Sequence, residues 1–171
     1  MSLSYDQIAG IYDSLYGQEQ YRKNAVASTF IKGKEKIIDI GCGTGILGEM
    51  LQNSEYYLCV DLSEGMLQVF KRKKLKVLSD ALLADAEHLP LREASFEVAT
   101  CITVLHEAPM AIEQIHRVLI PNGLAVLSLK KTLRAEPSLE GFALKRIIES
   151  GGDTIYILET VKQMPSHHPS E

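Results

Sequence analysis

Short apolar runs alternate along the chain with segments whose apolar residues recur every three or four positions. The runs lie at 36–40, 56–61, 82–84, 95–102, 124–129 and 154–161, and each has the length and composition of a buried strand. Helical spacing follows several of them, as at Ile46, Leu47, Met50 and Leu51. Strands that alternate with helices indicate an α/β fold, a Rossmann-like doubly wound and mostly parallel sheet in a single domain.

The beginning of the chain carries a helical pattern of its own. Tyr5, Ile8 and Tyr12 recur at helical intervals, Gly17 interrupts the pattern, and a second helical run occupies 21–30. We therefore predict an N-terminal helical segment, a binding domain and a disordered tail, over residues 1–30, 31–163 and 164–171.

The C-terminal part predicts a shortened sheet. Residues 139–150 have helical spacing, Gly151 and Gly152 end that helix, and Thr154–Val161 forms the last strand. The prolines that follow leave no room for another strand, so we expect six strands, a truncated C-terminal hairpin and Thr154–Val161 at the sheet edge. An uncovered edge offers unpaired backbone groups to another chain, which makes a homodimer a hypothesis.

Composition and charge narrow the class of protein. The chain has 171 residues, of which 46% are hydrophobic, and this suits one globular domain. A formal charge of −4 argues against a dedicated nucleic-acid surface. No apolar run approaches the length of a membrane span. The first residues lack a basic region and an apolar core of the secretory kind, so we expect a cytoplasmic protein.

The three cysteines, Cys42, Cys59 and Cys101, have no spacing typical of a metal site. Their number is odd, and none belongs to a Cys-x-x-Cys pair. We expect them to be small buried or pocket-lining thiols, with no disulfide and no structural zinc.

The most informative stretch is Asp39-Ile40-Gly41-Cys42-Gly43-Thr44-Gly45, which lies between a predicted strand and a predicted helix. A glycine-rich turn of this kind lets a ligand approach the backbone N–H groups at the helix start. Residues 43–48 match the G-x-G-x-x-G dinucleotide pattern, with Asp61 near the expected ribose position. A carboxylate at Asp39 would repel a pyrophosphate and attract an amine or a sulfonium. The alternative interpretation is that Asp39 only caps the turn or the helix, as aspartates at such positions do.

This stretch resembles the first motif, acidic-x-Gly-x-Gly-x-Gly, of the class I S-adenosylmethionine-dependent methyltransferases. The resemblance extends over about residues 5–130 and is nearest to the ubiquinone/menaquinone-type group. Val60-Asp61-Leu62-Ser63 with Met66, and Ala84-Asp85-Ala86-Glu87 with Pro90, resemble further motifs of that group.

The resemblance implies S-adenosylmethionine as cofactor and a set of residues that bind it. Asp39 and the glycine turn would meet the amino acid or sulfonium part, Asp61 and Leu62 the ribose, and Met66, Asp85 and Ala86 the adenine. Strand-end backbone at Cys101 and Ile102 would meet the methionine part. The implied cofactor-binding residues are Asp39, Gly41, Cys42, Gly43, Thr44, Gly45, Asp61, Leu62, Met66, Asp85, Ala86, Cys101 and Ile102.

Two residues are candidates for the reaction itself. His106 would face the methyl acceptor, either as a general base or as a wall of the pocket. Tyr12 would close over the sulfonium, with cation–π attraction, or would pack on the sheet. Residues 103–107 lack an Asn-Pro-Pro-Tyr-like sequence, which weighs against an amine of DNA or of a glutamine side chain as acceptor.

The sequence therefore predicts methyl transfer to a nucleophilic acceptor, a small molecule, without a metal. Two alternatives stay open. The chain is a non-catalytic cofactor-binding subunit of another methyltransferase, or an NAD-type oxidoreductase, although the latter leaves Asp39 and Asp85 unexplained.

Overall fold

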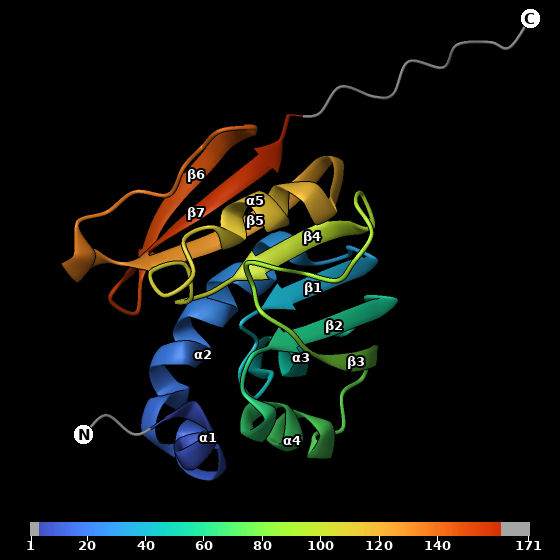
Figure 1. Ribbon diagram of the computed structural model, residues 1–171, viewed down its shortest axis with the longest axis vertical. Helices are drawn as coiled ribbons and strands as arrows, with labels where there is room; N and C mark the ends of the chain where they lie inside the picture. The colour runs from blue at the N-terminus through green and yellow to red at the C-terminus, as the bar shows by residue number, and fades with distance from the viewer. Residues whose placement is uncertain (1–3, 162–171) are drawn as a thin grey trace, which may run out of the picture.

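A computed structural model of the protein describes residues 4–161. Its centre is one seven-stranded sheet in the order β3-β2-β1-β4-β5-β7-β6 (Figure 1). The strands are β1 (Lys36–Ile40), β2 (Tyr56–Asp61), β3 (Leu78–Leu83), β4 (Phe96–Cys101), β5 (Leu119–Lys130), β6 (Phe142–Ser150) and β7 (Asp153–Thr160). Neighbouring strands among β1 to β5 pair in parallel, whereas β7 pairs antiparallel with both β5 and β6.

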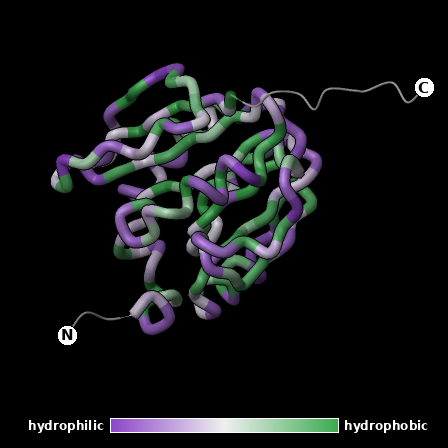
Figure 2. The backbone as a smooth tube through the Cα atoms, turned by 45° about the horizontal axis from the view of Figure 1, so that its top comes forward, coloured by the Kyte–Doolittle hydropathy of each residue, from purple (hydrophilic) through white to green (hydrophobic). Residues whose placement is uncertain are grey.

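Short helices cover both faces of this sheet. They are α1 (Tyr5–Ile8), α2 (Tyr12–Ile31), α3 (Ile46–Met50), α4 (Glu64–Arg72) and α5 (Ala111–Val118), with 3-10 turns η1 (Ala9–Ile11) and η2 (Lys131–Leu133). Apolar residues of α2, α3 and α4 pack on one face, and α5 packs on the other. The strands form the hydrophobic middle of the molecule (Figure 2). Ile37 and Ile38 are both fully buried although they point to opposite faces, as expected for a parallel strand between two layers.

The sequence pattern located most of the elements. Strand β2 has the predicted bounds, and α4 begins where its capping residue predicted, because the Ser63 hydroxyl accepts a hydrogen bond from the Met66 backbone N–H at 3.1 Å. Among the described residues, no helix combines the length and the apolar character needed to cross a membrane.

The C-terminal prediction was wrong in three respects. Residues 142–150 form a strand and not a helix, the sheet has seven strands and not six, and β7 lies between β5 and β6, so that β6 is the edge. The apolar positions in this segment fit both periods. Gly151 and Gly152, at φ 57° and 82°, form a two-residue turn that pairs Ser150 with Asp153 and makes a complete hairpin.

The predicted break at Gly17 was also wrong. Helix α2 continues from Tyr12 to Ile31, and the interruption lies earlier, in the 3-10 turn Ala9–Ile11. A glycine inside a helix costs only about 1 kcal/mol relative to alanine. The packing of Ala27 and Ile31 in the core outweighs that cost. The predicted tail, 164–171, lies outside the described residues.

The cysteine prediction was wrong for two of the three residues. Cys42 and Cys59 form a disulfide, while Cys101 is a free, buried thiol. The turn after β1 folds back over β2, where the Cys42 backbone N–H donates to the Val60 carbonyl at 3.0 Å. The two Cα atoms are therefore 5.4 Å apart, within the range that a disulfide requires. Their separation of 17 positions in the sequence conceals this approach.

Candidate functional site

The carboxyl ends of β1, β2 and β4 open towards the N-terminal helices, which lie across them (Figure 1). In a sheet of this kind, ligands bind outside the carboxyl ends of the strands. A cavity of about 30 Å³ lies there between α2, the glycine turn and the end of β4. It is lined by Tyr12, Gln20, Asn24, Asp39, Gly41, Cys42, Gly43, Thr44, Ile46 and Ile102.

The glycine turn has the backbone that only glycine adopts easily. Gly41, Gly43 and Gly45 have φ values of 71°, 55° and 78°. A side chain at Gly41 would collide with Val104, and one at Gly45 would collide with the ring of Phe70. At Gly43 no heavy atom lies within 4 Å of the position of a side chain, so this backbone faces open space. The turn is thus closed on its protein side and open on its ligand side.

Asp39 lies at the end of β1, almost fully buried. Its carboxylate accepts hydrogen bonds from the Tyr57 hydroxyl at 2.5 Å and the Thr100 hydroxyl at 2.8 Å. Burial raises the pKa of Asp39 to about 6, against the effect of these two donors, and the nearby charge of Asp61 raises it further. A cation placed beside Asp39 would favour its charged form.

Asp61 connects the glycine turn to the next strand. One carboxylate oxygen accepts from the Gly43 backbone N–H at 2.8 Å, and the other accepts from the Ser63 backbone N–H at 2.8 Å. Burial raises the pKa of Asp61 despite these hydrogen bonds. Each oxygen keeps a further lone pair, so the carboxylate can still accept from a vicinal diol. The next residue, Leu62, is exposed.

Asp85, Ala86 and Met66, three further sequence-predicted residues, do not line this cavity. Asp85 is solvent-exposed beyond β3, and hydrogen bonds from the Glu87 backbone N–H and from His88 lower its pKa. Ala86 packs partly against the core. Met66 is buried with Ile8 beneath α1.

The end of β4 continues this ring of residues. Cys101 is buried in the core, and burial raises the pKa of its thiol. Its neighbour Ile102 lines the cavity. The structure thus brings together Tyr12, Asp39, most of the glycine turn and Ile102, with Asp61 one hydrogen bond away.

Polar contacts hold the N-terminal helices over the cavity. The Asp6 carboxylate accepts from the Ser63 hydroxyl at 2.6 Å and from the Gly65 backbone N–H at 2.9 Å. The Asp13 carboxylate accepts from the Thr44 hydroxyl and pairs with Lys73 at 3.0 Å. Apart from the ion pair with Lys73, these contacts join α1 or α2 to residues within the predicted cofactor motifs.

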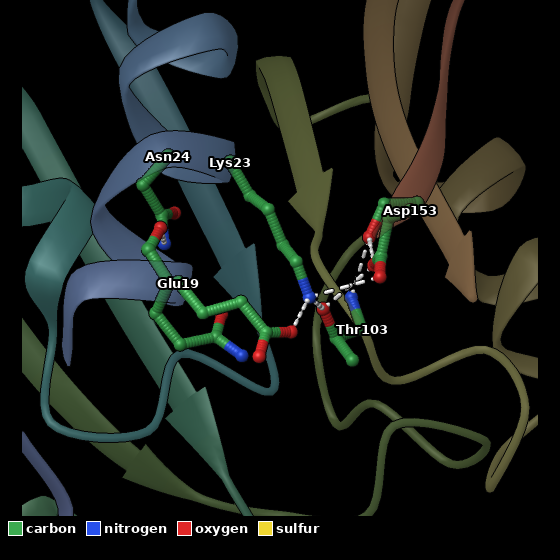
Figure 3. Close-up of polar contacts among 7 residues, drawn as sticks. Glu19, Lys23, Asn24, Thr103 and Asp153 are labelled. Atoms are coloured by element: carbon green, nitrogen blue, oxygen red, sulfur yellow. Dashed lines mark hydrogen bonds and ion pairs between the residues drawn. The ribbon is translucent and has the colours of Figure 1, made fainter. Parts of the chain in front are cut away.

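A buried ion pair was missed at the sequence level. Lys23 of α2 is fully buried, and its ammonium group lies 2.9 Å from Asp153 and 2.6 Å from Glu19 (Figure 3). Thr103 accepts from Lys23 at 3.1 Å and donates to Asp153 at 2.9 Å, while Ser128 donates to Asp153 at 2.6 Å. The cluster joins α2 to the ends of β4, β5 and β7.

Thr103 is the strained member of this cluster. Its φ is 60°, a conformation uncommon for a β-branched residue. The hydrogen bond from its backbone N–H to Ser128, at 2.8 Å, and its contacts with Lys23 and Asp153 hold it there. Strained residues are found most often at functional sites, and this one follows Ile102 of the cavity. The sequence carries no signal for this cluster, because a lysine among the polar residues of a helix is typical of an exposed face.

His106 lies beyond Thr103 on the loop that follows β4. Its Nε2 is 3.3 Å from a Glu107 carboxylate oxygen, and the Tyr5 hydroxyl donates to that same oxygen at 3.0 Å. Its Nδ1 is closed off from solvent and has no hydrogen-bond partner among the described residues. Tyr5 packs edge-on against Tyr12, with ring centroids 6.4 Å apart, so His106 is connected to the wall of the small cavity.

A second and larger cavity, of about 490 Å³, begins at His106. It lies between the loop after β4, α5 and the connection from β5 to β6. Its lining is Leu105, His106, Pro109, Ile112, Leu129, Leu133, Ala135, Glu136, Pro137 and Ser138. Of these residues, the sequence analysis singled out only His106, which it expected to face the methyl acceptor.

Comparison with known proteins assigns the chain to a family. Residues 38–127 match the model of a methyltransferase domain. The chain is 33% identical over 131 residues to the biotin biosynthesis bifunctional protein BioHC of Saccharophagus degradans, covering 73% of this chain and 24% of that protein. It is 32% identical over 175 residues to the ubiquinone/menaquinone biosynthesis C-methyltransferase UbiE of Campylobacter jejuni, covering 88% and 73%. The chain spans about half or less of the length of the first curated relatives it matches.

Solved structures share the fold. A S-adenosylmethionine-dependent methyltransferase from Aquifex aeolicus superposes with a TM-score of 0.72 at 18% identity, covering 94% of this chain and all of that one. A chain from the complex between the Haloferax volcanii Trm112 methyltransferase activator and a methyltransferase also gives 0.72, at 12% identity, covering 95% and 100%. The glycine turn and the two strand-end carboxylates fit the chemistry of that cofactor. The chain belongs to the methyltransferase domain family, within the class I S-adenosylmethionine-dependent methyltransferases.

Proposed function

We propose that the protein transfers a methyl group to a small-molecule acceptor, with the cofactor at the carboxyl ends of β1, β2 and β4. The observation that carries this proposal is the pair of strand-end carboxylates next to the open backbone at Gly43: Asp39 lines the same cavity as Gly43, and Asp61 accepts a hydrogen bond from the Gly43 backbone N–H. When bound, S-adenosylmethionine supplies a methyl group on a positively charged sulfur.

In this proposal each carboxylate binds one part of the cofactor. Asp39 attracts the cationic amino acid end, because its buried carboxylate is surrounded by neutral donors and gains from a nearby positive charge. Asp61 accepts hydrogen bonds from the ribose hydroxyls. The turn Gly41–Gly45 supplies backbone N–H groups, and Asp85 and Ala86 contribute to the adenine site from the rim. Leu62 and Met66 stay predicted contacts of the cofactor, as do Cys101 and Ile102.

Residues 1–30 act as a lid in this proposal. The cavity of about 30 Å³ holds only one or two water molecules, so the amino acid end of the cofactor does not fit while α2 lies in this position. Tyr12 and its neighbours must move outward for the cofactor to enter and return to enclose it. Enclosure excludes water and holds the reacting atoms in line, which supplies much of the acceleration in a reaction of this kind.

His106 holds or removes the proton of the acceptor. When the proton of the neutral ring lies on Nε2, facing Glu107, the unpartnered Nδ1 is left as a hydrogen-bond acceptor. Nδ1 is therefore the atom that would receive a proton from an acceptor hydroxyl.

The test is calorimetric titration with S-adenosylmethionine and S-adenosylhomocysteine. We expect micromolar binding to the wild type and at least a tenfold loss in Asp61→Ala, with little change in Asp80→Ala, an exposed aspartate on β3. Absence of binding in folded wild-type protein, or equal binding in both variants, would contradict the proposed site.

A second candidate function is a cofactor-binding subunit that needs a protein partner. It is favoured by the similarity to the Haloferax volcanii chain solved with the Trm112 activator. Turnover by the isolated chain would exclude this role, whereas cofactor binding without turnover, restored by a partner, would support it.

The homodimer hypothesis now concerns β6, which is the edge strand next to β7. Light scattering at micromolar concentration tests it, and a monomer would refute it. A cytoplasmic location stays a prediction. Thiol trapping in cells would test it, because disulfides such as that between Cys42 and Cys59 are uncommon in that compartment.

A further inference from the structure

The larger cavity has the size and shape of a ligand site. Its volume of about 490 Å³ lies within the usual range of small-molecule pockets. Its floor consists of Leu105, Ile112 and Leu129, which are buried core residues of the α5 face of the sheet. Pro109 and Pro137 form parts of its wall, and their rings restrict the backbone there. The pocket is therefore supported by rigid elements of the fold.

The formal charge in the lining of this cavity is negative. Neither lysine nor arginine lines it, and Glu136 is its only lining residue with a formal charge at neutral pH. A second carboxylate, Glu107, stands behind His106. Lys131, in the same connection between strands, is engaged with Glu149. An anionic ligand would thus be repelled and would find no positive partner in the wall, whereas burying a neutral apolar ligand against the floor is favourable.

The polar groups are few and specific. Among the lining residues, His106 and Ser138 are the uncharged polar ones. A buried nitrogen without a partner calls for an explanation, and Nδ1 of His106 is such an atom. A single hydroxyl on an otherwise apolar ligand would supply the missing donor when the loop adjusts around it.

We infer that this cavity binds the methyl acceptor, and that the acceptor is an uncharged, largely apolar compound with a hydroxyl group directed towards His106. The inference rests on the proposed function, because it takes the cofactor to lie at the neighbouring crevice. The connection is the loop after β4, whose Ile102 lines the cofactor crevice and whose Leu105 and His106 line this cavity.

The experiment uses two fluorescent probes of similar size, neutral 1-naphthol and anionic 1-naphthoate. For the full chain at pH 7.5 we expect saturable binding of 1-naphthol and at least tenfold weaker binding of 1-naphthoate. Glu136→Gln should reduce the ratio of the two probe affinities at least threefold. Glu140→Gln, which removes an exposed carboxylate outside the cavity, should leave that ratio unchanged. Equal binding of the two probes, or an unchanged ratio in Glu136→Gln, would overturn the inference.

A second pair of variants locates the probe. Leu133 lines the cavity and Leu139 does not. Both are exposed in the connection from β5 to β6, so we expect neither replacement to destabilise the fold. Leu133→Glu should weaken 1-naphthol at least tenfold and Leu139→Glu less than twofold. If both variants bind like the wild type, the probe lies elsewhere and the inference fails.

Titration of S-adenosylhomocysteine into the same samples separates the two proposals. Simultaneous binding, in which saturating S-adenosylhomocysteine does not displace 1-naphthol, is expected. Competition would place the probe in the cofactor crevice and overturn the inference. Cofactor binding without 1-naphthol binding would overturn the cavity assignment alone, whereas 1-naphthol binding without cofactor binding would overturn the proposed function.

Discussion

The two cavities at the carboxyl ends of the strands are built in opposite ways. The cofactor crevice has a cavity of about 30 Å³ beside carboxylates and the backbone N–H groups of the glycine turn, and a buried ion pair holds α2 next to it. The acceptor cavity has about 490 Å³ and an apolar floor. A site that binds one fixed cofactor uses directional polar contacts that recur as sequence motifs. A site for a variable acceptor needs only volume and a few polar groups, which loops supply without a motif.

The comparison predicts that polar changes near the crevice cost more stability than changes at the acceptor cavity. The largest effect is expected for Lys23→Met, which leaves the buried Asp153 carboxylate without its cation. Removing one partner of a buried ion pair typically costs about 3–5 kcal/mol of unfolding free energy. Urea unfolding measures this loss of unfolding free energy, and Arg22→Met, at an exposed position of the same helix, is the control. Leu133→Glu, at the acceptor cavity, should change it by less than about 0.5 kcal/mol.

The double variant Lys23→Met with Asp153→Asn removes both charges and should recover part of the loss. If Lys23→Met unfolds at the same urea concentration as the control, the cluster does not anchor α2. The two cavities would then differ in polarity but not in how much their residues contribute to stability.

The next largest effect concerns the disulfide that ties the glycine turn to β2. Reduction of the bond between Cys42 and Cys59 opens a loop of 17 positions, which the chain-entropy model values at about 3 kcal/mol. Urea unfolding of the wild type with and without a phosphine reductant should show this loss, and Cys59→Ser should not respond to the reductant. Titration of one thiol is expected in the unreduced protein after unfolding in urea, since Cys101 is free but buried in the folded state. Three titratable thiols would refute the bond.

The sequence predicted the crevice far better than its surroundings, for a physical reason. The glycine turn requires glycines because of its positive φ angles and its closeness to Val104 and Phe70. A requirement of this kind can be recognised in the sequence from the residue types alone. The disulfide and the contact of Lys23 with Asp153 join positions that are distant in the sequence. Only the fold brings such residues together.

The acceptor cavity and β6 were missed for different reasons. The cavity combines residues of the 105–112 and 129–138 segments, none of which has a residue pattern of its own. In β6, Leu144, Ile147 and Ile148 fit helical spacing as well as a strand. The deciding contacts are the pairs with β7, which short-range spacing does not encode. A short apolar run such as β6 fits both a helix and a strand, and only its pairing with the following strand decides between them.

The pKa of Asp39 gives a pH test that is specific to the crevice. Because the folded-state pKa, about 6, exceeds the ordinary aspartate value, the folded protein binds this proton more tightly than the unfolded chain. The contribution is therefore fully present below pH of about 4 and is lost as the pH rises through about 6, by up to about 3 kcal/mol. Relative to Asp39→Asn, the wild type should lose stability over that interval.

Cofactor binding should show the opposite trend with pH. A positively charged group beside Asp39 favours its ionised form, so affinity should fall as the pH drops below about 6, by up to tenfold per pH unit. Calorimetry at pH 5 and pH 7.5 measures this for the wild type and for Asp39→Asn, whose affinity should vary less. Equal slopes in both proteins would mean that Asp39 does not face the cation.

The smallest effect on stability is expected at the Asp13 end of the lid, which is held by Lys73. Lys73 pairs with Asp13 at 3.0 Å and with Glu49 at 2.8 Å, but both carboxylates are substantially exposed. An ion pair of this kind is worth at most about 1 kcal/mol and weakens in salt. Lys73→Met should therefore lower the unfolding free energy by less than about 1 kcal/mol, with the exposed Lys74→Met as control.

Local opening should nevertheless respond to this change. Amide hydrogen exchange in Lys73→Met is expected to accelerate over residues 5–16 and to stay unchanged over 23–31, which the buried Lys23 anchors. Acceleration over both segments, or over neither, would contradict this view. A lid held firmly at Lys23 and weakly at Asp13 opens from the Asp13 end, so that the cofactor enters beside Tyr12 while the part of α2 around Lys23 stays in place.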